Sequence, residues 1–443
     1  MQKRQTYGLF TTISMIVGIV IGSGIFFKAD DVLTATGGDV KKGLLLLSLG
    51  ALAIIFGSLT LSEFAFRSTT NGGFVGYFDE FVSEKAAGGF GFFQTFIYYP
   101  SINVVVSYAS AIYLTIILGI DASFEVQILI AYAIMTILIF LNTISRKLGG
   151  GIQNVTTIIK LIPLFLIAIL GFFSKVDYNL ADATKFDMKL SWLTALAPIA
   201  FSYDGWPIAT SITGEVKNPT KTMPIALICA PIIILISYLL FFLGVTNILE
   251  PTAIMELSDG YLNYIFVNLF GEKAGVVLTI FVFIAIVGVV NGLSLGGIRM
   301  PQALSEKNIF FSKKVAHINP KYQISIKSSI IYFIICSVWM FLHYITSKYQ
   351  LLNNSDVSEI AIVFGYLTYI LLYIKVIDFY KKGEIRSWVR GVFAPICAIL
   401  TAIFITCGAL FINFVNVSLF ILTCAIAFMI GFLKCGGRNG EKN

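Results

Sequence analysis

Charge is what this sequence most conspicuously lacks. Only 12% of its 443 residues are Asp, Glu, Lys or Arg, whereas 57% are hydrophobic, and the mean hydropathy is +0.87. A soluble domain is usually about 25% charged. Of the two structures that can cross a bilayer, long apolar helices of roughly 20 residues fit this composition. The shortage of charge therefore excludes an ordinary soluble domain and predicts an all-α polytopic membrane protein.

Histidine is also scarce, and the cysteines show no paired spacing. The two histidines, His317 and His343, lie far along the chain from any cluster of acids, and none of the six cysteines forms a CxxC pair. No zinc motif, phosphate-binding loop or nucleophile elbow occurs. These absences argue against an ATP-driven pump, a zinc protease and a disulfide framework. We therefore expect no metal, no cofactor and no enzymatic activity.

The apolar runs predict twelve transmembrane helices within a single transporter domain that covers residues 1–443. No loop is long enough to form a soluble domain. A window of about 20 residues places the spans approximately at 8–35, 43–66, 89–118, 124–143, 149–173, 190–213, 224–248, 272–300, 327–346, 357–380, 389–411 and 414–433.

The basic residues are distributed unequally between the two sides of these spans. With the N-terminus inside, most of the 31 lysines and arginines lie in cytoplasmic loops. The opposite side holds only Lys28, Lys41, Lys42, Lys175, Lys185, Lys189, Lys273 and Lys348. An excess of lysine and arginine is typical of the cytoplasmic loops of proteins in the cell membrane. The distribution therefore predicts that both termini are cytoplasmic. The net charge of +7 is thus a topology signal, and we expect no nucleic-acid partner.

Two of the predicted spans are interrupted. Gly22-Ser23-Gly24 breaks the first, and the run from Phe201 to Pro207 breaks the sixth. Each glycine costs about 1 kcal/mol relative to alanine in a helix interior, and unwound backbone at membrane depth must be buried in protein or line a cavity. Broken segments at matching positions of two halves indicate the binding site of an inverted-repeat transporter. We predict a 5+5 inverted repeat, with one repeat at about 8–173, the other at about 190–380, and two extra helices at about 389–433.

The sixth-span break carries one acid, Asp204. It is placed to cap the second half-helix, with Pro207 in the first turn, and Phe201, Tyr203 and Trp206 are expected to wall a pocket. Two interpretations of Asp204 stay open here. It is either only a cap, or it also takes part in gating or proton movement, because an acid within a membrane span is a functional candidate.

Lys160 is the basic residue placed deepest within a predicted span. A buried ammonium is costly unless it is paired or deprotonated. The functional hypothesis is that Lys160 bonds to the unwound first span in place of a coupling cation, with Asn291 or Ser294 of span eight completing a polar contact. The alternatives are an incidental lysine bonded to carbonyls, and an Asn291 that only joins helices.

Several of these residues together resemble a known family. The stretch Gly22-Ser23-Gly24-Ile25-Phe26, the break Phe201-Ser202-Tyr203-Asp204-Gly205-Trp206, and the following Gly214-Glu215-Val216-Lys217-Asn218-Pro219 match its signatures. Asn291, Arg299, Glu63, Gly72, Gly73, Tyr77 and Glu80 also keep its spacing. Over about residues 7–433 the chain resembles the L-amino-acid transporter family, bacterial type, of the amino acid–polyamine–organocation (APC) superfamily.

This resemblance implies a leucine-transporter-type fold with helices 1 and 6 broken. It implies that backbone N–H groups of Gly22, Ser23 and Gly24, flanked by Ile21 and Ile25, hold a substrate carboxylate. Carbonyls of the second break would accept from the amino group, at Phe201, Ser202, Tyr203, Asp204 and Gly205. Phe201 would be an aromatic gate and Lys160 would link the first and eighth spans. The loop Gly119–Glu125 has no cysteine, so no disulfide-linked heavy subunit is expected.

The sequence thus predicts a sodium-independent transporter that moves neutral L-amino acids across the membrane by alternating access, as an exchanger. Its expected partners are amino acid substrates and the lipid bilayer. The alternatives are a proton-coupled symporter and a cationic amino acid or polyamine antiporter, which Asp204 would support. Three other functions are disfavoured. The sequence shows no continuous polar stripe as a channel would need, no signalling domain as a sensor would need, and no catalytic cluster as a membrane enzyme would need.

Overall fold

The computed structural model of the chain describes residues 6–22, 24–68, 72–176, 199, 202–351, 359–412 and 414–436. Two of the predicted site residues, Ser23 and Phe201, lie outside these ranges. The described residues are helical apart from their connections and a single bridge between Tyr7 and Val216. The expected all-α architecture is confirmed for this part of the chain.

The α-helices are α1 (Leu9–Val20), α2 (Ala29–Thr36), α3 (Val40–Arg67), α4 (Phe74–Tyr77), α5 (Glu84–Phe93), α6 (Tyr99–Leu118), α7 (Phe124–Ile144), α8 (Arg146–Leu170), α10 (Pro219–Ile248), α11 (Pro251–Leu257), α12 (Tyr261–Phe270), α13 (Glu272–Gly297), α14 (Met300–Glu306), α15 (Ile326–Lys348), α16 (Glu359–Lys381), α17 (Ala394–Ile412) and α18 (Phe414–Gly436). Short 3₁₀ and π segments are η1 (Gly24–Phe27), η2 (Phe78–Val82), η3 (Gln94–Tyr98), η4 (Trp206–Glu215), η5 (Ser258–Gly260), η6 (Lys313–Val315) and η7 (Val389–Phe393).

Among the described residues, ten continuous helices are long and apolar enough to cross a membrane. They match ten of the twelve predicted spans. The remaining two are the interrupted ones. The first is divided into α1, η1 and α2. Much of the sixth lies outside the described residues, and the described part that follows its break is η4. Ten candidate spans are therefore shown among the described residues, while the count of twelve and the inverted repeat stay predictions.

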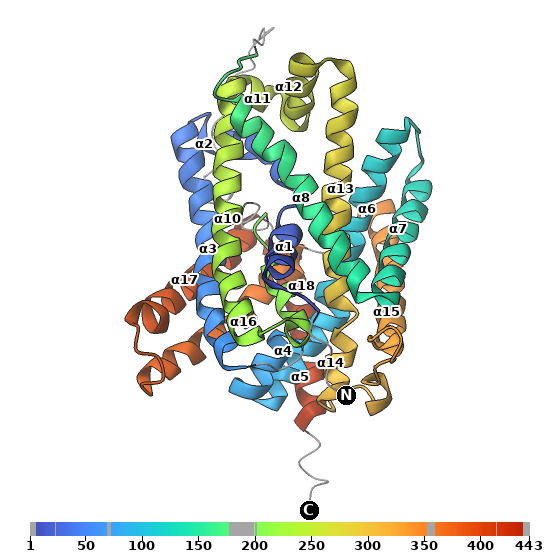
Figure 1. Cartoon of the computed structure of the whole chain (residues 1–443), viewed down its shortest axis with the longest axis vertical. Helices are drawn as coiled ribbons and strands as arrows, with labels where there is room; N and C mark the ends of the chain where they lie inside the picture. The colour runs from blue at the N-terminus through green and yellow to red at the C-terminus, as the bar shows by residue number, and fades with distance from the viewer. Residues whose placement is uncertain are drawn as a thin grey trace, which may run out of the picture.

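The short helix α1 lies at the centre of the bundle, where α8, α10, α13 and η4 pack against it (Figure 1). Two extensive helix pairs frame this centre: α3 packs on α10, and α6 packs on α13. Most residues of α1 are buried, among them Met15 and Ile16, and Ile21 just after it is completely buried. The break of the first span is thus enclosed by protein, as unwound backbone at membrane depth requires.

Close helix contacts depend on glycine. A Cβ on Gly171, at the end of α8, would lie 2.6 Å from the Cα atom of Gly244 in α10, and one on Gly244 would lie 2.7 Å from the Cα atom of Ala168. Small residues at such crossings let two backbones approach within a bilayer. The pair Gly171 and Gly244 therefore sets the spacing between α8, which carries Lys160, and α10.

The segment between α10 and α13 forms the helices α11 and α12 at the end of the bundle opposite α5 and α14 (Figure 1). Helix α11 packs on α2. Tyr261 donates a hydrogen bond to the carbonyl of Phe26 at 2.7 Å, and Ser258 donates one to Asp30 at 3.1 Å. This connection is therefore bound directly to the second half of the interrupted first span.

Candidate substrate site

The first break begins where α1 ends. Ile21 adopts an extended conformation (φ −76°, ψ 92°), and η1 starts at Gly24. Gly22 N–H donates to the carbonyl of Val20 at 2.9 Å, so it is already used within the turn. The first N–H groups of a helix have no partner inside it, which leaves the start of η1 as the source of donors. The break also frees carbonyls of α1, because helix C-termini leave acceptors without partners.

Lys160 of α8 uses those carbonyls. Its side chain is completely buried, and Nζ donates to the carbonyls of Gly18 at 2.7 Å, Ile21 at 2.6 Å and Ala285 at 3.0 Å. An ammonium group has three donors, so all three are satisfied. The lysine therefore ties α8 to the end of α1 and to α13.

The second break turns sharply at Gly205, whose φ of 96° suits glycine. A Cβ there would lie 2.6 Å from Cγ2 of Ile19, so the two breaks approach closely. Tyr238 of α10 joins them further, because its hydroxyl lies 2.9 Å from the carbonyl of Ser202 and 3.3 Å from that of Val20. Sequence reasoning missed Tyr238, since nothing in an apolar span marks one tyrosine as a partner of two distant breaks.

Asp204 does not have the predicted role of helix cap. Gly205 occupies the cap position of η4, without a side-chain hydrogen bond, and Pro207 lies in the first turn as expected. The carboxylate of Asp204 instead accepts a hydrogen bond from the hydroxyl of Tyr98 at 2.7 Å. Tyr98 ends η3, just before α6, so this bond joins the second break to the third span.

A cavity of about 110 Å³ lies where the two breaks meet. It is walled by both breaks, by one face of the third span, and by α13 and α16. The lining residues are Ile19, Val20, Gly22, Gly24, Tyr98, Ile102, Val106, Ser202, Asp204, Gly205, Ile208, Val289, Leu293 and Ile362.

Five predicted substrate-site residues line this cavity, namely Gly22, Gly24, Ser202, Asp204 and Gly205. Four others that the structure describes do not line it. Ile21 and Ile25 are buried in the core beside the break. Tyr203 and Trp206 were expected to wall the pocket, and this expectation is wrong for both.

Tyr203 and Trp206 anchor the second break from behind. The hydroxyl of Tyr203 donates to the carbonyl of Leu47 in α3 at 3.0 Å. The ring of Trp206 packs edge-on against Phe74 and Tyr369, with centroid separations of 6.0 and 6.4 Å. Both side chains are completely buried. Their large apolar surfaces stabilise η4 against α3, α4 and α16.

Asn291 and Ser294 of α13 lie in two other polar networks, and neither makes a hydrogen bond to Lys160. Asn291 donates to Gln153 at 2.9 Å and to the carbonyl of Gly149 at 3.1 Å, and accepts from Asn142 at 2.9 Å. Ser294 accepts from Asn103 at 3.1 Å. The expected contact is therefore wrong. These bonds join α7 and α8 to α13, and α6 to α13.

The residues that sequence reasoning missed lie mainly on continuous helices. Tyr98, Ile102 and Val106 follow one another at intervals of four residues, and Val289 and Leu293 of α13 do the same. Such intervals place side chains on one helix face. That spacing was visible in the sequence, but it does not indicate which face of an apolar helix meets a cavity.

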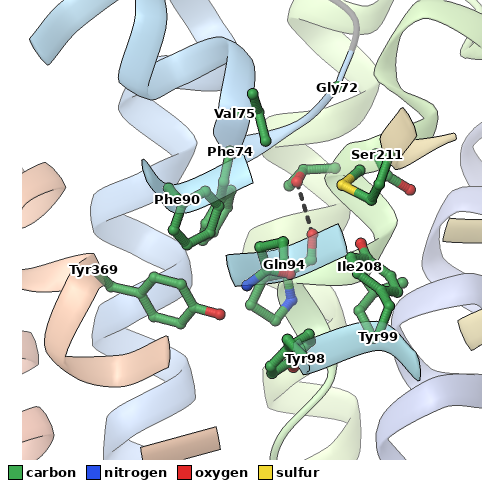
Figure 2. Close-up of a pocket in the computed structure, with 13 residues that line it drawn as sticks. Gly72, Phe74, Val75, Phe90, Gln94, Tyr98, Tyr99, Ile208, Ser211 and Tyr369 are labelled. Atoms are coloured by element: carbon green, nitrogen blue, oxygen red, sulfur yellow. Dashed lines mark hydrogen bonds between the residues drawn. The ribbon is translucent and has the colours of Figure 1, made fainter. Parts of the chain in front are cut away.

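Tyr98 and Ile208 also line a second, much smaller void of about 10 Å³ (Figure 2). This inner void lies between Gly72, Phe74, Gln94, Ser211 and Tyr369, and Figure 2 shows the Tyr369 hydroxyl directed toward Gln94 and Tyr98. The two side chains that border both spaces are therefore the partition between them.

Beyond the inner void, a buried ion pair closes the end of the bundle where α1 begins. Arg299 binds Glu215 through two contacts, Nε to Oε1 and Nη2 to Oε2, both 2.8 Å long. The backbone N–H groups of Thr6 and Tyr7 donate to the carbonyl of Glu215 at 2.7 and 3.0 Å. The residues that precede α1, the end of η4 and the turn between α13 and α14 are thus held together, so the cavity is closed toward this end.

A cavity formed where two interrupted segments meet, within a bundle of apolar helices, defines a membrane transporter. The chain belongs to the amino acid permease family, whose model matches residues 7–434. This family lies within the APC superfamily, so the resemblance seen in the sequence is confirmed. The protein is a multi-pass membrane protein and an amino acid transporter.

Known relatives agree with this assignment. The chain is 27% identical to the serine/threonine exchanger SteT of Bacillus subtilis (strain 168), over 97% of this chain and 94% of the relative. It is 24% identical to the b(0,+)-type amino acid transporter 1 of Mus musculus, over 90% and 81% of the two chains. A cystine/glutamate transporter of Homo sapiens is 29% identical over 54% of this chain and 49% of its own.

Proposed function

We propose that the protein exchanges neutral L-amino acids across the cell membrane by alternating access, without sodium. The observation that carries this proposal is the cavity between the two breaks, together with a lysine that already occupies the freed carbonyls of the first break. Two relatives, a serine/threonine exchanger and a b(0,+)-type amino acid transporter, support it.

The lining of the cavity favours a neutral side chain. Ile102, Val106, Val289, Leu293 and Ile362 present branched apolar groups to it. A charged side chain directed at these apolar groups would lose its hydration without gaining a partner from them. The substrate carboxylate would meet the N–H groups at the start of η1, where the helix dipole is favourable. The ammonium group would meet the second break, near Ser202 and Asp204.

Lys160 supports independence from sodium. Its Nζ atom lies within hydrogen-bond distance of the carbonyls of Gly18 and Ile21, and carbonyls freed by unwinding are what coordinate a coupling cation in transporters of this architecture. A cation at the same oxygens would face the ammonium charge at contact distance. The proposed site therefore has no place for sodium at these oxygens.

Tyr98 supports a gating role for the partition. Its hydroxyl is held by Asp204, and its ring separates the cavity from the inner void. A substrate ammonium that binds Asp204 competes with Tyr98 for the same carboxylate. We propose that this competition loosens the partition, and that opening of the Glu215–Arg299 pair then completes the path.

We propose that both termini lie in the cytoplasm, because most lysines and arginines lie in the loops on the same side of the membrane as the termini. The helix pairs α3–α10 and α6–α13 join positions two and seven, and three and eight, of the predicted spans, as two inverted repeats of five would. The loop Gly119–Glu125 contains no cysteine. This feature supports a chain that acts without a disulfide-linked heavy subunit.

The decisive test is uptake of a labelled panel of neutral amino acids into proteoliposomes without sodium. Uptake into vesicles loaded with unlabelled amino acid, and not into empty vesicles, is the result expected of an exchanger. Uptake into empty vesicles under an inward proton gradient would instead establish a proton symporter. Uptake that requires sodium would refute the role proposed for Lys160.

A second candidate function, transport of cationic amino acids or polyamines, rests on Asp204. It is the acid that lines the cavity. Asp204→Asn keeps the shape of this side chain and removes its charge. If the carboxylate selects a cationic side chain, the variant loses lysine and arginine transport and keeps neutral transport. If wild-type protein transports no cationic substrate, this candidate is excluded.

A further inference from the structure

A second sizeable cavity, of about 330 Å³, lies apart from the substrate site. It opens at the end of the bundle where α8 begins and where α7 ends, next to the residues that precede α1 and follow η4. Arg146, Lys147, Lys217 and Lys321 line it. These four residues come from three segments that are distant in the sequence, so the fold gathers their charges at one place.

No acid balances these charges within the lining. The segments 144–150, 216–222 and 313–327 contain no Asp or Glu at all. The nearest acid that the structure pairs with this cluster is Glu215, whose carboxylate is bound by Arg299 through two contacts of 2.8 Å. Cavities lined by one sign of charge concentrate counter-ions.

Arg146 provides independent evidence for a ligand. Its side chain is only 4% exposed, and Nη2 donates to the carbonyl of Gln323. The Nε atom lies 3.6 Å from Oε2 of Glu215, too far for a hydrogen bond, and Nε and Nη1 have no hydrogen-bond partner among the described residues. A buried guanidinium with unused donors is costly. Both nitrogens are buried in this arrangement, and an oxyanion in the cavity would supply their missing acceptors once the side chain turns toward it.

Helix α8 adds to this field. Its N-cap, Ser145, lines the cavity, and the helix is 25 residues long, so its positive end faces the same space. We propose that this cavity binds an oxyanion of the phosphate class, either a phospholipid headgroup or a soluble phosphate. Arginine and a helix N-terminus are favourable partners of phosphate oxygens, and basic pockets between membrane helices on the cytoplasmic side hold lipid headgroups.

Binding at this place has a consequence for the transport cycle. Thr6 precedes α1 and Lys217 follows η4, at the closed end of the bundle. Both residues line the cavity together with the start of α8 and the loop at Lys321. A bound anion would therefore stabilise the arrangement in which this end of the bundle is closed.

The test uses two matched double variants of the full-length protein. Lys147→Gln with Lys321→Gln removes two exposed lysines of the cavity, and Lys313→Gln with Lys314→Gln removes two exposed lysines outside its lining. In detergent, thermal stability is measured against sodium phosphate, with sodium chloride at equal ionic strength as reference. In parallel, binding of phosphatidic acid and of phosphatidylcholine is measured by native mass spectrometry. Stability without added anion reports whether each variant folds.

We expect saturable binding of phosphate, of phosphatidic acid, or of both. The cavity variant should bind about tenfold more weakly, which equals about 1.4 kcal/mol, and the control variant should match wild type. Binding of phosphate identifies a soluble anion, and binding of phosphatidic acid alone identifies a headgroup. Absence of saturable binding to wild type, equal weakening in both variants, or no weakening in the cavity variant would overturn the proposal.

Discussion

At the scale of single residues, Lys160 carries the sharpest prediction. Lys160→Met removes the donor from the buried carbonyls of Gly18, Ile21 and Ala285, and each unsatisfied carbonyl costs about 1–3 kcal/mol. We expect uptake to fall by about tenfold or more, with a lower thermal stability in detergent. Substitution of the exposed Lys41 by Met is the control and should change neither. Normal uptake by Lys160→Met would show that the lysine is dispensable.

Tyr98→Phe tests the bond to Asp204 while it keeps the ring in the partition. Loss of a hydrogen bond to a charged group is worth about 1.5–3 kcal/mol, and it leaves the carboxylate free toward the cavity. Because the substrate ammonium then no longer competes with the Tyr98 hydroxyl for Asp204, we expect the half-saturating concentration of neutral amino acids for uptake to fall about tenfold. Concentration-dependent uptake of a labelled neutral amino acid measures it. An unchanged or higher half-saturating concentration would show that the substrate and Tyr98 do not share the carboxylate.

The site shows which residue roles a sequence can reveal. Gly22, Gly24 and Gly205 were predicted because glycine within an apolar run weakens a helix and so marks the place where it breaks. The expected contact of Asn291 with Lys160 failed because Asn291 binds Gln153, seven residues and about 10 Å along α8 from the lysine. It is instead the carbonyl of Ala285 that reaches Lys160. Side-chain direction around a uniformly apolar helix depends on packing partners that the sequence does not name.

At the scale of elements, the contact between α8 and α10 decides whether Lys160 reaches α1. Gly244→Ala would place a methyl group 2.7 Å from the Cα atom of Ala168, and overpacking of this kind costs about 1–3 kcal/mol. We expect a lower melting temperature and reduced uptake. Gly151→Ala, in the same helix α8, meets nothing within 4 Å and should be neutral or stabilising. Equal melting temperatures for the two variants would contradict this account of the helix contact.

The elements themselves were largely predictable. Ten spans agree with the apolar runs because hydrocarbon leaves a long apolar segment little choice other than a helix. The position of Tyr203 and Trp206 was mistaken for a different reason, since aromatic residues beside a break suit a pocket wall and a buried anchor equally well, and only the presence of α3 and α16 behind them decides between the two.

At the scale of the whole molecule, the Glu215–Arg299 pair holds the end near the N-terminus closed. Breaking a buried pair on one side costs about 3–5 kcal/mol, so Glu215→Gln should shift the protein toward an arrangement open at this end. The accessibility of Ser211, which is buried and lines the inner void, reports this opening. In a background without the native cysteines, Ser211→Cys should react slowly with a membrane-impermeant maleimide from that side, and about tenfold faster with Glu215→Gln. Equal rates would show that the pair does not control access.

The attachment of the ammonium group of Lys160 to α8 has an electrical consequence. A diffusible coupling ion crosses the membrane with its substrate and lets the voltage do work on each cycle, whereas a charge anchored to a helix returns with the protein. A zwitterion exchanged for another zwitterion in this cavity would carry no net charge in either direction. The membrane potential would then neither drive nor oppose the exchange, and its direction would be set by the amino acid concentrations on the two sides alone.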